Sequence, residues 1–261
     1  MHGLVILWHS VRLALLHELT YRANFAVQLL TSAIGLGASL TFLAVMRRHA
    51  DALAGWRPPE LLALWGVFYV LTGLLGAIVQ PSLQRLMDDV RHGTLDFVLI
   101  RPAEPQLLVS VRQIEVWKLV DVAVGVGLLS VALTELGGRV GVIQAAGFAV
   151  ALVAGGAIAY SCCLALAALA FWSLRVENAL ILFLSLWETG RWPVGVYPAW
   201  LRGLLTFLVP IALATTLPAE VLVGGLHPTA LAVAVGVAVV LLVASRWLWR
   251  RGLRRYSGAS A

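Results

Sequence analysis

The stretch 140–174 contains no charged side chain, and this feature most limits how the chain can fold. About 20 apolar residues in a helix are enough to cross the ~30 Å hydrocarbon core of a bilayer. Across the whole chain 61% of residues are hydrophobic and only 12% are charged, whereas soluble domains carry about 25% charged residues. Too few polar side chains remain to cover a soluble globule, so the sequence predicts an all-α polytopic membrane protein.

Six transmembrane helices are expected, within a single transmembrane domain that covers 1–261. The expected spans are 23–45, 61–80, 119–136, 140–174, a stretch that begins at 179, and 229–245. Basic residues are concentrated after the second span and after the sixth. Because cytoplasmic loops are enriched in Lys and Arg, we expect both of these segments, and both termini, on the cytoplasmic side.

Three segments outside these spans have their own patterns. Residues 1–22 place apolar side chains at helical spacing among His and Arg, which predicts a helix lying at the membrane interface. Residues 191–228 are apolar but interrupted by prolines, and the number of spans on either side predicts a re-entrant hairpin on the outer side. Residues 246–261 form a basic tail, expected in the cytoplasm.

The longest charged segment, RLMDDVRHGTLDFVLIRPAEP, lies in the predicted cytoplasmic loop 81–106. Ser82–Arg91 can form a short helix with Leu83 and Leu86 on one face, and Gly93 is a typical helix end. We expect the polar residues of this helix to pair with a soluble partner, and its leucines to fill a groove on that partner. An ordinary solvated loop is the alternative.

The charged residues form no recognised catalytic motif. The single lysine, Lys118, is not part of a P-loop, so the chain is not expected to bind ATP. Asp88, Asp89 and Asp96 leave one enzymatic alternative open, an intramembrane lipid-modifying enzyme that holds a divalent metal ion with these carboxylates. Otherwise no metal site is expected. The basic residues flank apolar stretches, which favours membrane topology over nucleic-acid binding.

Glu188 and Arg191 admit two interpretations. An ionisable side chain within a membrane span is costly and marks a functional site by default, here a path through the membrane. The two residues are also three positions apart near the predicted outer edge of the span. An ion pair between neighbouring turns, or side chains reaching toward the interface, would explain them without any function.

The segment Arg91–Pro102, RHGTLDFVLIRP, resembles the R-x-G-x-L-D-x-x-L-x-R-P signature of a bacterial branch of type-2 ABC export permeases. The later stretch 192–202, WPVGVYPAWLR, looks like the extracellular hairpin of the same branch. The number of spans and the basic tail agree with it, so the resemblance covers most of the chain. It implies a six-span permease in the bacterial plasma membrane, in contact with membrane lipid, with a coupling helix in the loop after the second span.

The resemblance also implies partners and a task. The chain would bind no cofactor and would not itself be an enzyme. It would act with a dimer of a separate ABC ATPase subunit, which binds ATP and Mg, and with a second copy or a paralogous permease. The expected cargo is an amphiphilic, lipid-like or drug-like molecule that is exported. The residues expected to couple to the ATPase are Leu83, Arg85, Leu86, Asp88, Asp89, Arg91, Gly93, Leu95, Asp96, Arg101 and Pro102.

Overall fold

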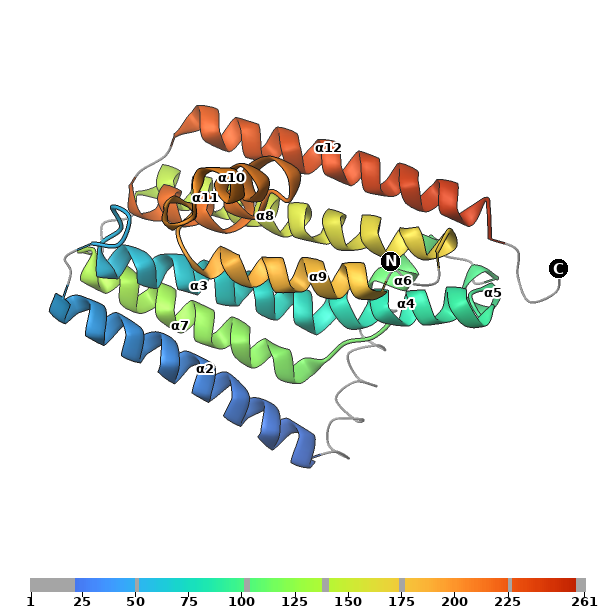
Figure 1. Ribbon diagram of the computed structural model, residues 1–261, viewed down its shortest axis with the longest axis horizontal. Helices are drawn as coiled ribbons and strands as arrows, with labels where there is room; N and C mark the ends of the chain where they lie inside the picture. The colour runs from blue at the N-terminus through green and yellow to red at the C-terminus, as the bar shows by residue number, and fades with distance from the viewer. Residues whose placement is uncertain are drawn as a thin grey trace.

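The computed structural model describes residues 22–49, 52–100, 104–137, 141–173, 177–224 and 227–256 (Figure 1). The regular elements of these residues are helices, joined by short helical turns. The longer helices are α2 (Arg22–His49), α3 (Pro58–Leu74), α4 (Gln80–His92), α7 (Leu119–Glu135), α8 (Val142–Ala168), α9 (Glu177–Trp187), α11 (Ile211–Val223) and α12 (Pro228–Leu253). The shorter ones are α5 (Asp96–Leu99), α6 (Pro105–Ser110) and α10 (Ala199–Gly203). The helical turns are η1 (Leu75–Val79), η2 (Val116–Lys118), η3 (Leu169–Phe171), η4 (Glu188–Arg191), η5 (Val194–Val196) and η6 (Leu204–Leu208).

The helices form one bundle with α3 at its centre. Helix α3 packs along α7, α8 packs along α12, and α11 packs against both α8 and α3. Figure 1 shows the long helices running along the long axis of the molecule, with α2 at one edge and α12 at the other. The largest buried side chains include Trp65 and Phe68 of α3 and Trp187 at the end of α9. The apolar core therefore surrounds the helix that leads directly into the charged segment.

Helices α3 and α4 form one continuous helix through the turn η1, from Pro58 to His92 over 35 residues. At 1.5 Å per residue it is about 52 Å long, well beyond the ~30 Å of a hydrocarbon core. The predicted helix Ser82–Arg91 is present, and it follows the second predicted span without a break. It is the end of the helix that includes the second predicted span.

The helix continues past Pro81 because the hydrogen bond that this proline removes is replaced from another part of the chain. Pro81 lacks the N–H that would bond to the carbonyl of Ala77, and a wider π-turn, η1, lies just before it. The Ala77 carbonyl instead accepts the N–H of Glu115, with an N–O distance of 2.8 Å. Ser82 adds a second contact, since its Oγ donates to the carbonyl of Gln113 at 2.8 Å and accepts the Gln113 N–H at 3.1 Å. The chain returning toward α7 is thereby attached to the helix.

The six predicted spans are found in part. Within the described residues, four helical stretches are long and apolar enough to cross a membrane: Pro58–His92, Val116–Glu135, Val142–Phe171 and Pro228–Leu253. A fifth is reached if Ala199–Leu208 and Ile211–Val223, which meet at 91°, count as one broken span. In α2 the apolar part, Leu30–Phe42, is shorter. The described part of this all-helical protein thus contains four or five candidate spans and one bent helix pair.

The region expected to hold the fifth span and the hairpin contains the short helix α9 followed by the bent helix pair, which is either a broken span or a re-entrant loop. Helix α9 has 11 residues and is about 16 Å long, roughly half of a crossing. A methyl group on Gly190 would lie 2.7 Å from Cγ2 of Ile211, so α11 begins beside the end of α9. The far end of α11 lies near the start of α3, where Gly224 and Arg57 line the same pocket. Helix α11 therefore extends to the end of the bundle. The predicted interfacial helix at 1–22 lies outside the described residues, except that Arg22 begins α2.

Neighbouring glycines in α8 provide a matched test of this packing. A methyl group at position 155 would lie 2.3 Å from the carbonyl oxygen of Ala214, whereas at Gly156 its nearest neighbour would be Leu71 at 3.7 Å. Both changes to alanine raise helix propensity by about 1 kcal/mol, so that gain cancels in the comparison. We expect Gly155→Ala to lower stability by about 1–3 kcal/mol relative to Gly156→Ala, because α8 and α11 must separate. Thermal unfolding of both purified variants in detergent, followed by circular dichroism, measures this difference. Equal melting temperatures would contradict the close approach of the two helices.

Candidate functional site at the charged end of the bundle

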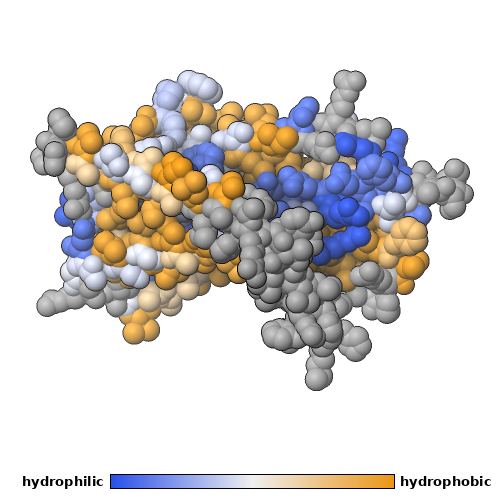
Figure 2. Space-filling model, turned by 90° about the horizontal axis from the view of Figure 1, so that it is seen from below, coloured by the Kyte–Doolittle hydropathy of each residue, from blue (hydrophilic) through white to orange (hydrophobic). Residues whose placement is uncertain are grey.

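One end of the bundle combines the charged segment with the C-terminal part of α12. Figure 1 shows α4, α5 and α6 meeting the ends of α8 and α12 there. Figure 2 shows the hydrophilic surface gathered toward this end, while apolar surface covers most of the opposite half of the visible face. The described arginines at this end are Arg85, Arg91, Arg112, Arg246, Arg250, Arg251, Arg254 and Arg255. A polar, basic end beside an apolar body is the arrangement expected where a bundle leaves a membrane.

Gly93 ends helix α4, as predicted. Its φ of 70° lies in the left-handed region, which glycine adopts without steric cost. The next residue, Thr94, donates its N–H to the carbonyl of Asp89 at 2.9 Å. The turn directs the chain into the short helix α5, which packs against α6.

The carboxylate of Asp89 joins three parts of this end. Its residue is only 2% exposed. It forms an ion pair with Arg112 on the returning chain, accepts a hydrogen bond from Thr94 Oγ1 at 2.9 Å, and lies 3.5 Å from Nε of Arg85. Asp89 was expected to pair with a partner protein. It is instead paired inside the chain, because a buried carboxylate needs compensating donors close by.

The leucines of the segment are also buried within this chain. Leu83, Leu86 and Leu95 are all within 1% of complete burial. Leu83 and Leu86 belong to α4, whose apolar face packs against α6 and α8, and Leu95 directly precedes α5. The expectation that Leu83 and Leu86 fill a groove on another protein is therefore wrong.

Two apolar side chains in α5 are exposed instead. Phe97 is 69% exposed and Ile100, directly after the helix, is 80% exposed. They are three residues apart, so they lie on one face of the helical turn. Arg91 and His92 are exposed nearby in sequence, and Asp88 and Asp96 are partly exposed. Sequence reasoning passed over Phe97 and Ile100, although two large apolar residues in a charged segment were the available signal. Exposed apolar residues with polar neighbours are typical of protein contact sites.

The end of α12 is attached to the same region. Arg246 forms an ion pair with Glu104, just before α6. Phe171 packs edge-on against Trp249 and against Tyr256, with centroid distances of 5.5 and 6.1 Å. Burial, together with the nearby carboxylate of Asp96, raises the pKa of the Tyr256 phenol, so it stays protonated at neutral pH. The last helix is therefore connected to both α5 and α6.

The three aspartates of the enzymatic alternative do not form a metal site. Within the described ranges, no group of three His, Cys, Asp or Glu side chains is placed to hold a metal ion. Asp89 is instead occupied by Arg112 and Thr94. The geometry gives the hypothesis of a metal-dependent lipid-modifying enzyme no support.

Glu188 and Arg191 form the ion pair that the sequence suggested. Arg191 Nη2 lies 2.9 Å from Glu188 Oε2. The guanidinium carbon lies 5.2 Å from the ring centroid of Phe68 and 5.9 Å from that of Tyr69, within cation–π range. Arg191 is thus held against α3, while Glu188 is 53% exposed at its side chain.

Residues 33–260 match the sequence model of a family described as ABC-2 family transporter protein. The chain belongs to this family. A search of curated proteins and a search of solved structures each found no match. As an ABC-2 transporter chain it is a multi-pass membrane component of an ABC transporter, a type of subunit that is typically not catalytic itself, and its membership implies an ATPase partner.

Not every predicted coupling residue of this ABC-2 chain can be placed. Arg101 and Pro102 lie outside the described residues. Among those that are described, Leu83, Leu86, Leu95 and Asp89 are buried. Gly93 ends a helix. Arg85 contacts Asp89 while remaining largely exposed. Arg85, Asp88, Arg91 and Asp96 are at least partly exposed, and His92, Phe97 and Ile100 are exposed beside them.

The adjacent carboxylates of Asp88 and Asp89 allow a buried, structural carboxylate to be compared with one on the surface. We expect Asp89→Asn to destabilise the ABC-2 chain by about 1–3 kcal/mol, because Arg112 loses its charged partner in a partly buried site. The cost stays below that of a fully buried ion pair because both arginines are partly exposed. Asp88→Asn, one position earlier on a more open face, should change stability by less than about 0.5 kcal/mol. Thermal unfolding of the purified variants measures both values, and equal destabilisation would refute the role given to Asp89.

Proposed function

We propose that this chain is the membrane-spanning subunit of an ATP-driven exporter and that a separate ATPase drives it through the charged end of the bundle. The cargo would be amphiphilic, lipid-like or drug-like, and the direction of transport follows the family resemblance. The observation that carries the proposal is the pair Phe97 and Ile100. Both are exposed beyond a helix that continues from the membrane-crossing helix α3.

The coupling surface is defined here as Arg91, His92, Phe97 and Ile100, with Asp88 and Asp96 beside them. An apolar centre with a polar surround is the usual composition of a protein contact that carries binding energy. Helix α4 supports this surface and is continuous with α3, so a displacement of the surface moves the centre of the bundle. ATPase closure would act on the membrane part through this connection.

We propose six crossings, made by α2, α3 with α4, α7, α8, a composite of α9 and α11, and α12. Helices α9 and α11 contain 11 and 13 residues, which amounts to about 36 Å and exceeds one hydrocarbon thickness. The alternating directions of the long helices in Figure 1 support this count. The arginines at the α4 and α12 ends support a cytoplasmic location for that end and for both termini, in a bacterial plasma membrane.

A second subunit of the same kind, either a second copy or a paralogue, would complete the transport path. We place Glu188 and Arg191 beside this path. We put Glu188 near mid-membrane depth because its ion-pair partner Arg191 packs on Phe68 and Tyr69, midway along Pro58–Val79. Lipid contact with a charged side chain is costly at this depth. The half-exposed carboxylate of Glu188 therefore favours a polar neighbour, such as a water-filled path between two subunits.

The coupling surface can be tested by removing its apolar centre. We expect the double variant Phe97→Ser and Ile100→Ser to bind the ATPase at least about tenfold more weakly, since two exposed anchors are lost. The ATPase would be the P-loop protein encoded beside this gene, co-expressed and quantified by co-purification. The matched control, Val142→Ser and Ile143→Ser, removes equally exposed apolar residues at the other end of the bundle. Unchanged ATPase binding by the Phe97 and Ile100 variant would remove the coupling surface from consideration.

The proposed sidedness can be tested by cysteine labelling. In a background with Cys162→Ala and Cys163→Ala, single cysteines are introduced as Arg91→Cys or Val142→Cys, at opposite ends of the bundle. In intact cells a membrane-impermeant maleimide should label the Val142→Cys protein, and it should label the Arg91→Cys protein only after permeabilisation. Labelling of Arg91→Cys in intact cells would place the charged end outside and overturn the transport proposal.

A further inference from the structure

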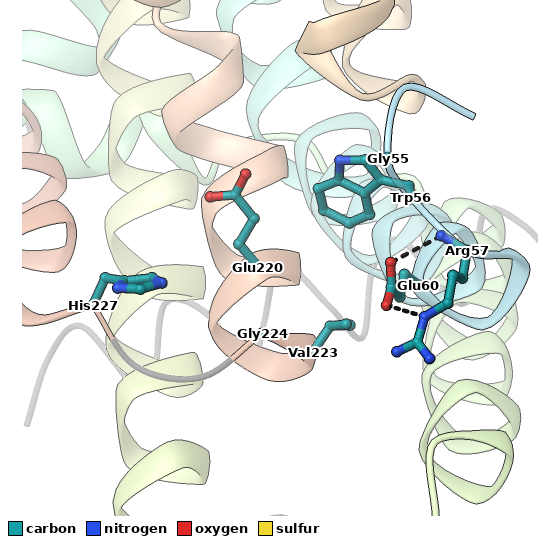
Figure 3. Close-up of a pocket in the computed structure, with 8 residues that line it drawn as sticks. All are labelled: Gly55, Trp56, Arg57, Glu60, Glu220, Val223, Gly224 and His227. Carbon is teal, nitrogen blue, oxygen red and sulfur yellow. Dashed lines mark hydrogen bonds and ion pairs between the residues drawn. The ribbon is translucent and has the colours of Figure 1, made fainter. Parts of the chain in front are cut away.

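The opposite end of the bundle contains a pocket of about 440 Å³ that plays no part in the proposed coupling. It lies between the start of α3, the end of α11 and the start of α12 (Figure 3). Its lining is Gly55, Trp56, Arg57, Glu60, Glu220, Val223, Gly224 and His227. A concave site with an aromatic wall and a few convergent polar groups is the usual form of a small-molecule site.

A tight two-residue turn fixes the aromatic wall of this pocket. Leu53 and Trp56 exchange backbone hydrogen bonds of 2.9 and 3.0 Å. Between them, Ala54 and Gly55 have φ values of 50° and 87°, which is the geometry of a hairpin turn with both central residues left-handed. For Ala54 this conformation is unfavourable, and such strain is found at ligand-binding positions more often than elsewhere. The position of Trp56 is thus held by backbone geometry.

The charges on the pocket wall leave one carboxylate without a counter-charge bonded to it. Glu60 accepts hydrogen bonds from the Arg57 backbone N–H at 2.9 Å and from Arg57 Nε at 2.7 Å, so these two side chains neutralise each other. The side-chain carboxylate of Glu220 has no hydrogen bond or ion pair within the described part of the chain, although His227 lies near enough to influence it electrostatically. In Figure 3 Glu220 projects from α11 between Trp56 and His227.

We propose that this pocket binds a compact organic ammonium ion, with its charge on Glu220 and its alkyl groups against the indole of Trp56. A carboxylate supplies the opposite charge, and the face of tryptophan attracts ammonium groups through its quadrupole. Among the acidic and arginine side chains of the lining, the carboxylates Glu60 and Glu220 outnumber the single guanidinium of Arg57, which gives these three groups a net charge of −1. A cation is therefore favoured over an anion or a neutral molecule. The site belongs to this chain alone and does not depend on an ATPase or on transport.

Choline and its uncharged isostere 3,3-dimethylbutan-1-ol test the proposal directly. The full-length chain is purified in a maltoside detergent, which contains no ammonium group, and each compound is titrated at pH 8 by saturation-transfer difference NMR. We expect choline to bind at least tenfold more tightly than the isostere. Glu220→Gln and Trp56→Leu should each weaken choline binding at least tenfold, while Trp56→Phe, which keeps an aromatic face, should retain most of it.

Glu104→Gln is the matched control, because it removes one half-exposed carboxylate at the opposite end of the bundle, outside the pocket. It should leave choline binding unchanged. Melting temperatures of all variants identify any that fail to fold, and Glu220→Gln, on an exposed residue, should melt with the parent chain. Equal binding of choline and the isostere, no binding to the parent chain, or equal losses in the Glu220→Gln and Glu104→Gln variants would each overturn the proposal. Choline binding is measured without any ATPase, so its result is independent of the coupling test above. If choline binds but the coupling test fails, the ammonium site is supported and the transport proposal is refuted.

Discussion

The continuity of the helix from Pro58 to His92 is the constraint on which the rest of the structure depends. A single helix holds the core residues Trp65 and Phe68, begins at the aromatic pocket and ends beneath the coupling surface. Backbone groups in a bilayer must be satisfied internally, and a continuous helix does this at every depth. The aromatic pocket and the coupling surface therefore lie at opposite ends of one rigid element, so a tilt or shift of that element displaces residues at both sites.

The continuity of this helix depends on the contacts that compensate for one proline within it. Pro81 would normally interrupt a helix, because it removes a donor and crowds the preceding turn. Here the π-turn accommodates its ring, and Glu115 supplies the donor that the Ala77 carbonyl lacks. The Asp89–Arg112 ion pair attaches the same returning segment two turns further along. Two local defects, an unpaired carbonyl and a buried carboxylate, are thus satisfied by the same stretch of chain.

The sequence identified most of the long spans because absence of charge is a local property that burial in lipid requires. Residues 61–80, 119–136, 140–174 and 229–245 all fall largely within the candidate spans of the structure. Gly93 was likewise identified from local chemistry alone. Three features were not accessible in this way. The apolar face at Leu83 and Leu86 must pack against another surface, but the sequence pattern does not show whether that surface belongs to this chain or to another protein. The continuation of the helix past Pro81 was not predicted, because the N–H of Glu115 that satisfies the Ala77 carbonyl comes from far along the chain. The close approach of Gly155 to Ala214 depends on how two distant helices meet.

The length of the central helix sets the distance between the bilayer surface and a soluble subunit bound at the end of α4. Helix α3 and turn η1 together contain 22 residues, 17 plus 5, which occupy about 33 Å and match the hydrocarbon thickness. The 13 residues of α4 then extend about 20 Å further, past a headgroup layer of roughly 5–8 Å. A soluble subunit bound to α5 would therefore not touch the bilayer surface, and an aqueous gap would separate the two. The arginines at the base of α4 and α12 would border this gap, where phospholipid headgroups and the underside of the soluble subunit both face them.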